Sequence, residues 1–234
     1  MWSRLTDQRS SDRRAGALRA RAVFHAGAFA AVLLVAACGG RDAWLHDPLP
    51  ERGPAVDTAP LPARAPRVRL TTTVGDIVVG LYEDRAPISS ANFLRYVDEG
   101  FYDGTIFHRV EPPTALAVVQ GGGYDQDLSA RPTHDPIVSE ADNGLANRRG
   151  TVALARRGND TGSATSQFFI NYLDNPSLDH AGPDHPGYTV FGIVVEGIEI
   201  VDRITLVPTA PEPGTTLGYV PMVPLVIERA QRDP

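Results

Sequence analysis

The sequence predicts a mainly β fold, either a closed antiparallel barrel or a sandwich, with two helices. Short stretches of alternating apolar residues recur from residue 67 onward. Glycine-containing turns separate these stretches. Only two segments carry the spacing of an amphipathic helix. A barrel suits such a chain because closure leaves no exposed sheet edge.

The elements are expected as follows. A hairpin of two strands covers 67–74 and 77–82, and a helix covers 87–99, with Ile88, Ala91, Leu94 and Val97 on its core face beside Phe93 and Tyr96. Further strands are expected at 105–110, 116–120, 136–139, 150–155, 166–171 and 189–195, and a second helix at 197–204. A last strand at 223–229 is expected to pair with the first strand and close the barrel.

Residues 1–37 are expected to form a secretory signal peptide. Six arginines precede an apolar run from Ala22 to Ala37, which is too short for a spanning helix. The string Val35-Ala36-Ala37-Cys38-Gly39 resembles the lipobox of bacterial lipoproteins, which implies diacylation of Cys38. An ordinary cleaved signal with an incidental cysteine is the alternative. Cys38 is the only cysteine, so no intramolecular disulfide can form.

Composition restricts the partners and the chemistry. Without residues 1–37, 16 basic and 26 acidic side chains remain, a net charge of −10. We therefore expect no nucleic-acid binding, and we expect membrane attachment only through the N-terminal lipid. The chain has no lysine, which excludes Schiff-base chemistry and the P-loop lysine.

Residues 38–66 are expected to form a disordered, proline-rich tether. This tether would hold a folded domain, 67–230, away from a membrane. Residues 231–234 are expected to be a tail. These features predict a lipid-anchored protein of the bacterial cell envelope that faces the periplasm. Gly39, where some lipoproteins have aspartate, favours the outer membrane by analogy with lipoprotein sorting.

One set of residues predicts an unusual kind of site. Arg109 lies in an apolar strand, Gln120 leads into three glycines, and Gln167 precedes Phe168-Phe169-Ile170. An arginine, two amides and a phenylalanine in one groove would contain neither a nucleophile nor a metal. Such a site suits a reaction that breaks no covalent bond, such as rotation about an X-Pro amide.

These strings, in order, resemble the cyclophilin-type peptidyl-prolyl isomerases, and in particular their bacterial branch. The resemblance covers about 67–230 and rests on Asn92-Phe93-Leu94, Gly100-Phe101-Tyr102, Thr105 to Val110, Gln120-Gly121-Gly122, Glu140-Ala141, Asn143-Gly144-Leu145, Arg149-Gly150-Thr151, Ser166 to Ile170 and Val190-Phe191-Gly192. It implies a closed eight-stranded antiparallel barrel capped by two α-helices, with the site on one outer face.

The resemblance also implies roles for single residues. Arg109 would be catalytic, donating to the prolyl nitrogen as the amide twists. The substrate-binding residues would be His108, Gln120, Ala155, Arg156, Gln167, Phe169, Leu178 and Tyr188. No cofactor and no metal is expected, and the protein is expected to act as a monomer on proline-containing polypeptides in the folding of envelope proteins.

The segment after Arg109 departs from the family. Glu111 to Val119 is nine residues long where the family has six, and it has no aromatic residue. Leu116 or Ala117 stands where a pocket phenylalanine is expected. A proline-peptide-binding or chaperone module with little turnover is therefore the alternative function.

Two other motifs carry less weight. His180 and His185, near Asp179 and Asp184, fit no common zinc spacing. Gly121-Gly122-Gly123 lacks the Lys-Ser/Thr that follows a phosphate loop. A tight turn explains the glycines better.

Overall fold

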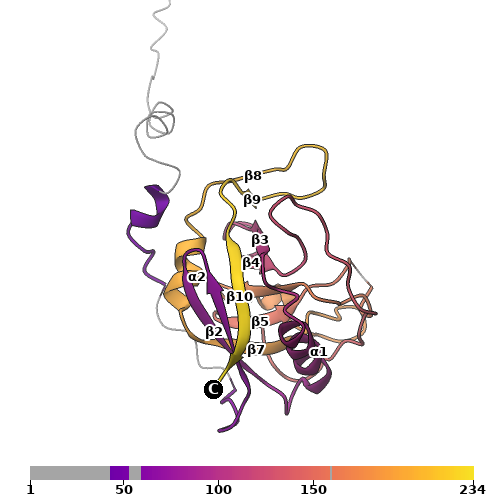
Figure 1. Ribbon diagram of the computed structural model, residues 1–234. Helices are drawn as coiled ribbons and strands as arrows, with labels where there is room; N and C mark the ends of the chain where they lie inside the picture. Colours follow the sequence, from indigo (N-terminus) through magenta and orange to yellow (C-terminus); the bar gives the residue numbers. More distant parts are fainter. Residues whose placement is uncertain (1–42, 53–58, 159) are drawn as a thin grey trace, which may run out of the picture. The chain divides into compact units, whose positions relative to one another are not determined.

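The structure, a computed structural model, describes residues 43–52, 59–158 and 160–234 (Figure 1). Eight of its strands form a closed barrel in the order β1-β10-β3-β4-β6-β5-β7-β2, and every neighbouring pair is antiparallel. The strands are β1 (Arg67–Thr72), β2 (Gly75–Leu81), β3 (Thr105–Val110), β4 (Val118–Gly121), β5 (Thr151–Leu154), β6 (Phe168–Asn171), β7 (Val190–Glu196) and β10 (Val226–Asp233). The predicted eight-stranded barrel is confirmed. Outside it, β8 (Thr209–Ala210) and β9 (Val220–Pro221) form a small two-stranded sheet.

The two ends of the folded domain close the barrel together, as the sequence predicts. Leu70 of β1 pairs with Ala230 of β10, and β10 pairs on its other side with β3. Figure 1 shows β10, in yellow, running the length of the barrel beside the indigo hairpin that contains β2. β10 extends to Asp233, so residues 231–233 of the expected tail belong to a strand.

Helix α1 (Pro87–Asp98) begins at a proline and takes its N-terminal cap from a distant loop. Both carboxylate oxygens of Glu140 accept backbone N–H groups of the first turn, from Ile88 at 3.0 Å and from Ser89 at 2.8 Å. A carboxylate at this end satisfies N–H groups that have no partner within the helix and opposes the positive end of its dipole. The Glu140-Ala141 motif therefore holds α1 against the barrel.

The core face of α1 differs in part from the prediction. Phe93, Leu94, Tyr96 and Val97 are buried as expected. Ile88 is 43% exposed and Ala91 is exposed, because the helix turns a different stripe toward the barrel. Buried Ser89, Ser90 and Asn92 complete that stripe, and a search for apolar spacing overlooks such polar core residues.

Apolar side chains cover both faces of the barrel wall near β5. All four residues of β5 are buried. Val152 and Leu154 join the main core cluster with the ring of Phe93, whereas Ala153 joins a second cluster that contains Phe169. This second cluster is an apolar floor on the opposite face of the wall.

Helix α2 (Ile198–Ile204) occurs where the sequence predicts it, but the strand expected at 136–139 does not form. Ile137 makes only an isolated bridge to Ala164. Pro136 has no N–H to donate, and Val138 is 63% exposed, so the segment offers neither a continuous ladder nor a buried face.

Part of the predicted tether is packed. Residues Ala43–His46 form the 3-10 helix η1, and Trp44 is only 6% exposed. Further along, the hydroxyl of Tyr82 donates to the carbonyl of Ala59 at 2.8 Å. The predicted signal peptide and Cys38 lie outside the described residues. Among the described residues, no helix has the length and apolarity needed to cross a membrane.

Candidate active site

Three of the predicted site residues, Arg109, Gln120 and Phe169, lie in one row across the outer face of the barrel. Arg109 on β3 pairs with Gln120 on β4, Gln120 pairs with Phe169 on β6, and Phe169 pairs with Ala153 on β5. Residues paired across antiparallel strands project from the same face of a sheet. The next row, Val110, Val119, Ile170 and Val152, belongs to the main core cluster. The row that holds Arg109 therefore faces outward.

An irregularity in β3 sets the direction of Arg109. The register between β3 and β4 shifts between Phe107 and Arg109, which places an extra residue, His108, in the strand. Strict alternation would send Phe107 and Val110 to opposite faces, yet both lie in the main core cluster. A β-bulge changes the alternation in this way and re-aims the side chains that follow it.

Hydrogen bonds join the three polar side chains of the site. An η nitrogen of Arg109 donates to Oε1 of Gln120 at 3.2 Å, and Nε2 of Gln120 donates to Oε1 of Gln167 at 2.9 Å. A Cβ at Gly123 would lie 2.4 Å from Nε2 of Gln167, so only glycine leaves room for this amide. The hydrogen bonds therefore run in one direction, from the guanidinium of Arg109 through Gln120 to Gln167.

The guanidinium of Arg109 is partly removed from water. Its side chain is 38% exposed. Burial lowers the pKa of Arg109, and the nearby Tyr188 and Tyr219 oppose this shift. Arginine nevertheless keeps its proton at physiological pH because its ordinary pKa lies far above neutrality. The site thus presents a permanent cation beside an apolar surface.

That apolar surface is a cluster of packed side chains that contains Phe169, the neighbour of Gln120 in the row. Phe169 and Leu178 are 4% and 7% exposed, and Tyr188 and Leu116 pack against the same cluster. The rings of Phe169 and Tyr188 meet edge to face, with centroids 5.6 Å apart. Leu116 thus packs against this cluster, whereas Ala117 lies in the main core cluster.

Ala155 and Arg156 follow β5 and lie next to this cluster. The N–H of Ala155 donates to the carbonyl of Gln167 at 2.9 Å. The guanidinium of Arg156 lies 4.4 Å from the ring centroid of Tyr188, and its Nε donates to the carbonyl of Gly187 at 3.0 Å. This cation on an aromatic face holds the tyrosine in place.

His108 is the most deeply buried of the predicted site residues. It is 1% exposed, and its ring lies 4.7 Å from that of Tyr124. Burial lowers the pKa of His108 to about 4, so the imidazole is neutral at physiological pH. His108 and Arg109 also line a hollow together with Thr216, Leu217 and Gly218 of the β8–β9 connection, residues that the sequence did not assign to the site.

Glu111 is a further residue of the site, and it was not among the residues predicted from the sequence. Its carboxylate is 3% exposed and forms an ion pair with Arg109. One signal was available in the sequence, since this acidic residue follows directly after Arg109-Val110 in the segment that departs from the family pattern.

Among the described residues, no group of three or more His, Cys, Asp or Glu side chains could hold a metal ion. A ring nitrogen of His180 contacts the carbonyl of Pro186 at 3.0 Å, and one of His185 contacts the carbonyl of Ser177 at 2.9 Å. A ring nitrogen beside a carbonyl is a donor, so these two nitrogens order the loop.

Several known proteins are similar to this chain in sequence. Residues 67–231 match the family described as cyclophilin type peptidyl-prolyl cis-trans isomerase/CLD. Peptidyl-prolyl cis-trans isomerase A of Dickeya dadantii is 49% identical over 164 residues, which cover 70% of this chain and 83% of the relative. Peptidyl-prolyl cis-trans isomerase cyp18 of Streptomyces antibioticus is 48% identical over 168 residues, covering 70% and 96%. Isomerase B of Escherichia coli is 46% identical over 144 residues, covering 61% and 85%.

A solved structure shares the fold. The cyclophilin-type isomerase of Cryptosporidium parvum, crystallised in the presence of the dipeptide Ala-Pro, superposes with a TM-score of 0.58 at 24% identity, covering 72% of this chain and 99% of that one. The family match over residues 67–231, together with relatives that are 48–49% identical, identifies the chain as a member of the cyclophilin-type peptidyl-prolyl cis-trans isomerase family.

Proposed function

We propose that this isomerase acts through Arg109, which donates a hydrogen bond to the prolyl nitrogen while the X-Pro bond twists. The observation that carries the proposal is the outward row in which Arg109, Gln120 and Phe169 are neighbours on adjacent strands. This row sets a cation next to an apolar surface against which a proline ring would pack. No covalent intermediate is required.

The chemistry depends on a change at the prolyl nitrogen. In the planar amide its lone pair is delocalised into the carbonyl, and the barrier to rotation is about 18–20 kcal/mol. Twisting ends the delocalisation and localises the lone pair on nitrogen. A guanidinium held above that nitrogen then gains a hydrogen bond that the planar substrate cannot accept, so its binding energy lowers the barrier.

The neighbouring residues would hold the substrate still while the bond turns. Phe169, Leu178, Leu116 and Tyr188 would receive the proline ring, and Gln120 would steady the guanidinium. Because the N–H of Ala155 is bonded within the protein, an extended peptide would pair here through carbonyl groups near Ala155 and Arg156. The substrates are accordingly proline-containing polypeptides.

Replacing the guanidinium tests this mechanism. In a protease-coupled assay with an Ala-Pro peptide, Arg109→Ala should lower kcat/KM on the order of 10²–10³-fold, as removal of one transition-state donor does in other enzymes. Arg95→Ala is the matched control, because Arg95 lies on the exposed face of α1 and its ion pair with Glu99 is long, at 3.7 Å. An unchanged rate in Arg109→Ala contradicts the mechanism.

The longer segment Glu111 to Val119 favours one alternative, a proline-peptide-binding module with little turnover. Its acidic residue, Glu111, forms an ion pair with the guanidinium of Arg109. Leu116 stands where an aromatic residue is expected. The same assay separates the two functions. A module of this kind binds the peptide in a titration, yet the wild-type protein does not accelerate isomerisation.

We further propose that the isomerase is lipid-anchored at Cys38 and assists protein folding at the periplasmic face of the outer membrane. The support is the arginine-rich leader, its short apolar run and the lipobox-like string. Labelled palmitate should enter the wild-type protein expressed in a bacterium and should not enter Cys38→Ser. Fractionation should place the wild type with outer membranes and the variant in the periplasm. A wild-type protein that is unlabelled and soluble would refute the anchor.

A further inference from the structure

Glu111 lies where the chain leaves β3, and its carboxylate is almost completely removed from water. The side chain is 3% exposed. One carboxylate oxygen forms the ion pair with an η nitrogen of Arg109, and the other accepts the N–H of Leu116 at 3.0 Å. A single carboxylate therefore joins the catalytic guanidinium to the segment that carries Leu116.

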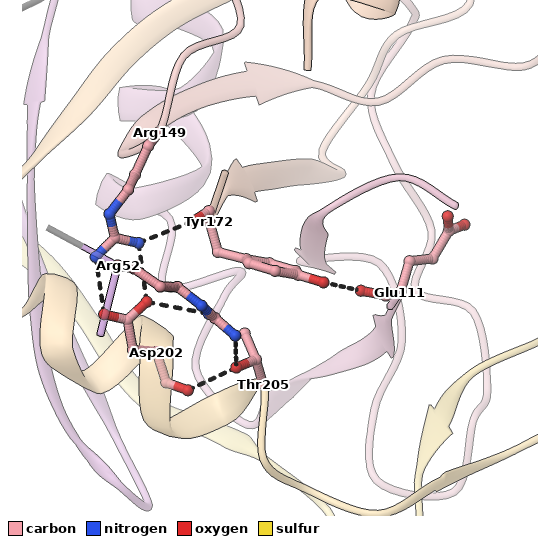
Figure 2. Close-up of polar contacts among 6 residues, drawn as sticks. All are labelled: Arg52, Glu111, Arg149, Tyr172, Asp202 and Thr205. Carbon is pink, nitrogen blue, oxygen red and sulfur yellow. Dashed lines mark hydrogen bonds and ion pairs between the residues drawn. The ribbon is translucent and has the colours of Figure 1, made fainter. Parts of the chain in front are cut away.

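The backbone of Glu111 is held from two further directions. Its N–H donates to the carbonyl of Val118 at 3.0 Å. Its carbonyl accepts the hydroxyl of buried Tyr172 at 2.6 Å, and Figure 2 shows the Glu111 side chain extending away from that bond. With its main chain fixed in this way, Glu111 can present its carboxylate in only a narrow range of positions.

We propose that Glu111 is a positioning residue that fixes the plane of the Arg109 guanidinium, an inference that rests on the proposed role of Arg109. Gln120 takes one terminal nitrogen and Glu111 takes the other. Two partners on one planar group define its orientation, whereas a single partner leaves it free to turn about the bond that it makes. The bulge aims the strand, and Glu111 then sets the final angle of the side chain.

Electrostatics acts in the opposite direction but is the weaker effect. The carboxylate offsets part of the positive field that the guanidinium exerts on the prolyl nitrogen. The carboxylate contacts the guanidinium directly, whereas the prolyl nitrogen would contact only the guanidinium, and Coulomb interactions weaken with distance. A misplaced donor costs more, since a shift of about 1 Å can lower a rate on the order of 10²-fold. We therefore expect removal of the carboxylate to slow the enzyme.

The competing explanation is that Glu111 only folds its own loop through Leu116. A double-mutant cycle distinguishes the two roles. Glu111→Gln is nearly isosteric and keeps an oxygen that can accept the N–H of Leu116, but it removes the charge that faces Arg109. Each protein in the cycle is checked by circular dichroism. kcat/KM and the Kd for a proline peptide are then measured separately.

In the wild-type background, Glu111→Gln should lower kcat/KM about 10-fold and change the peptide Kd less than about twofold. In the Arg109→Ala background, the same substitution should change the residual rate less than about twofold, because no guanidinium remains to be positioned. Should Glu111→Gln not fold, Glu111→Asp enters the same cycle, since it keeps the charge but shortens its reach.

Three results overturn the inference. The first is an unchanged or faster rate in Glu111→Gln. The second is an equal loss in both backgrounds, which assigns Glu111 to loop folding alone. The third is a normal rate in Arg109→Ala, which removes the role of Arg109 and the inference with it. Only this last result contradicts the proposed function, so the two failures are distinguishable.

Discussion

His108 is a buried imidazole next to a guanidinium, and both facts act on its proton in the same direction. Burial lowers its pKa to about 4, and the charge of Arg109 adds a smaller lowering, against a backbone bond to Ile106 that raises it. The His108 side chain, which the sequence assigned to substrate binding, is thus uncharged and buried beside Arg109. Its burial gives the fold a dependence on acid.

The sign of that dependence follows from proton binding. Between pH 6.5 and about 4 the unfolded chain binds a proton at His108 and the folded chain does not. Stability from this group is therefore complete above pH 6.5 and falls as the pH drops toward 4. A shift of this size corresponds to about 3 kcal/mol in the free energy of unfolding.

Urea unfolding at pH 7.5 and pH 4.5 tests this expectation in the wild-type protein and in His108→Asn. The wild type should lose about 2–3 kcal/mol more than the variant between the two pH values. Exposed His134 provides the matched control, and His134→Asn should follow the wild type. Equal pH dependence in the wild type and in His108→Asn would show that the imidazole is not buried neutral.

At the scale of elements, periodicity predicted most of the barrel. β1, β2, β3, β7 and α2 lie where alternating or helical spacing placed them, and β10 closes the barrel against β1. These elements are long enough for one buried face to leave a clear pattern. The strand expected at 136–139 failed because four residues after a loop carry the same pattern without a partner strand to pair with.

The direction of Arg109 could not be read from β3 alone. Alternation within Phe107 to Val110 fails at the bulge, and a bulge is defined by the register against the partner strand β4. Only the family resemblance brought Arg109 and Gln120 to one face. Glu111 escaped notice for a related reason, because its contacts reach back to β3 and forward to Leu116 through a connection with no periodicity.

At the scale of the whole molecule, Asp202 of α2 joins three segments that are remote in the sequence. It forms a two-bond pair with Arg149, both contacts 2.8 Å, and accepts a further bond from Arg52 at 3.1 Å. Arg52 also donates to Thr205 and lies 4.5 Å from the ring centroid of Tyr172 (Figure 2). Because the hydroxyl of Tyr172 donates to the carbonyl of Glu111, Tyr172 connects this cluster to the site.

Arg52 belongs to the stretch that the sequence predicts as a disordered tether. Proline-rich composition and absent periodicity describe that stretch correctly, but they contain no information about a partner 150 residues away. The packing of residues 43–52 through Trp44 and Arg52 therefore had to come from the structure. It makes this part of the chain a contributor to the stability of the barrel.

Neutralising Asp202 should destabilise the molecule far more than neutralising an exposed partner of the same geometry. The side chains of Arg149 and Asp202 are 4% and 8% exposed, so Asp202→Asn leaves one buried cation without its counter-charge and weakens the hold on Arg52. Breaking such a pair costs about 3–5 kcal/mol.

Asp98 forms an equally bidentate pair with Arg232 at 2.8 and 2.7 Å, but these side chains are 49% and 53% exposed. Asp98→Asn should therefore cost less than about 1 kcal/mol. Urea unfolding of both variants at pH 7.5 measures the difference, and equal losses would mean that solvent screens the Asp202 cluster as well.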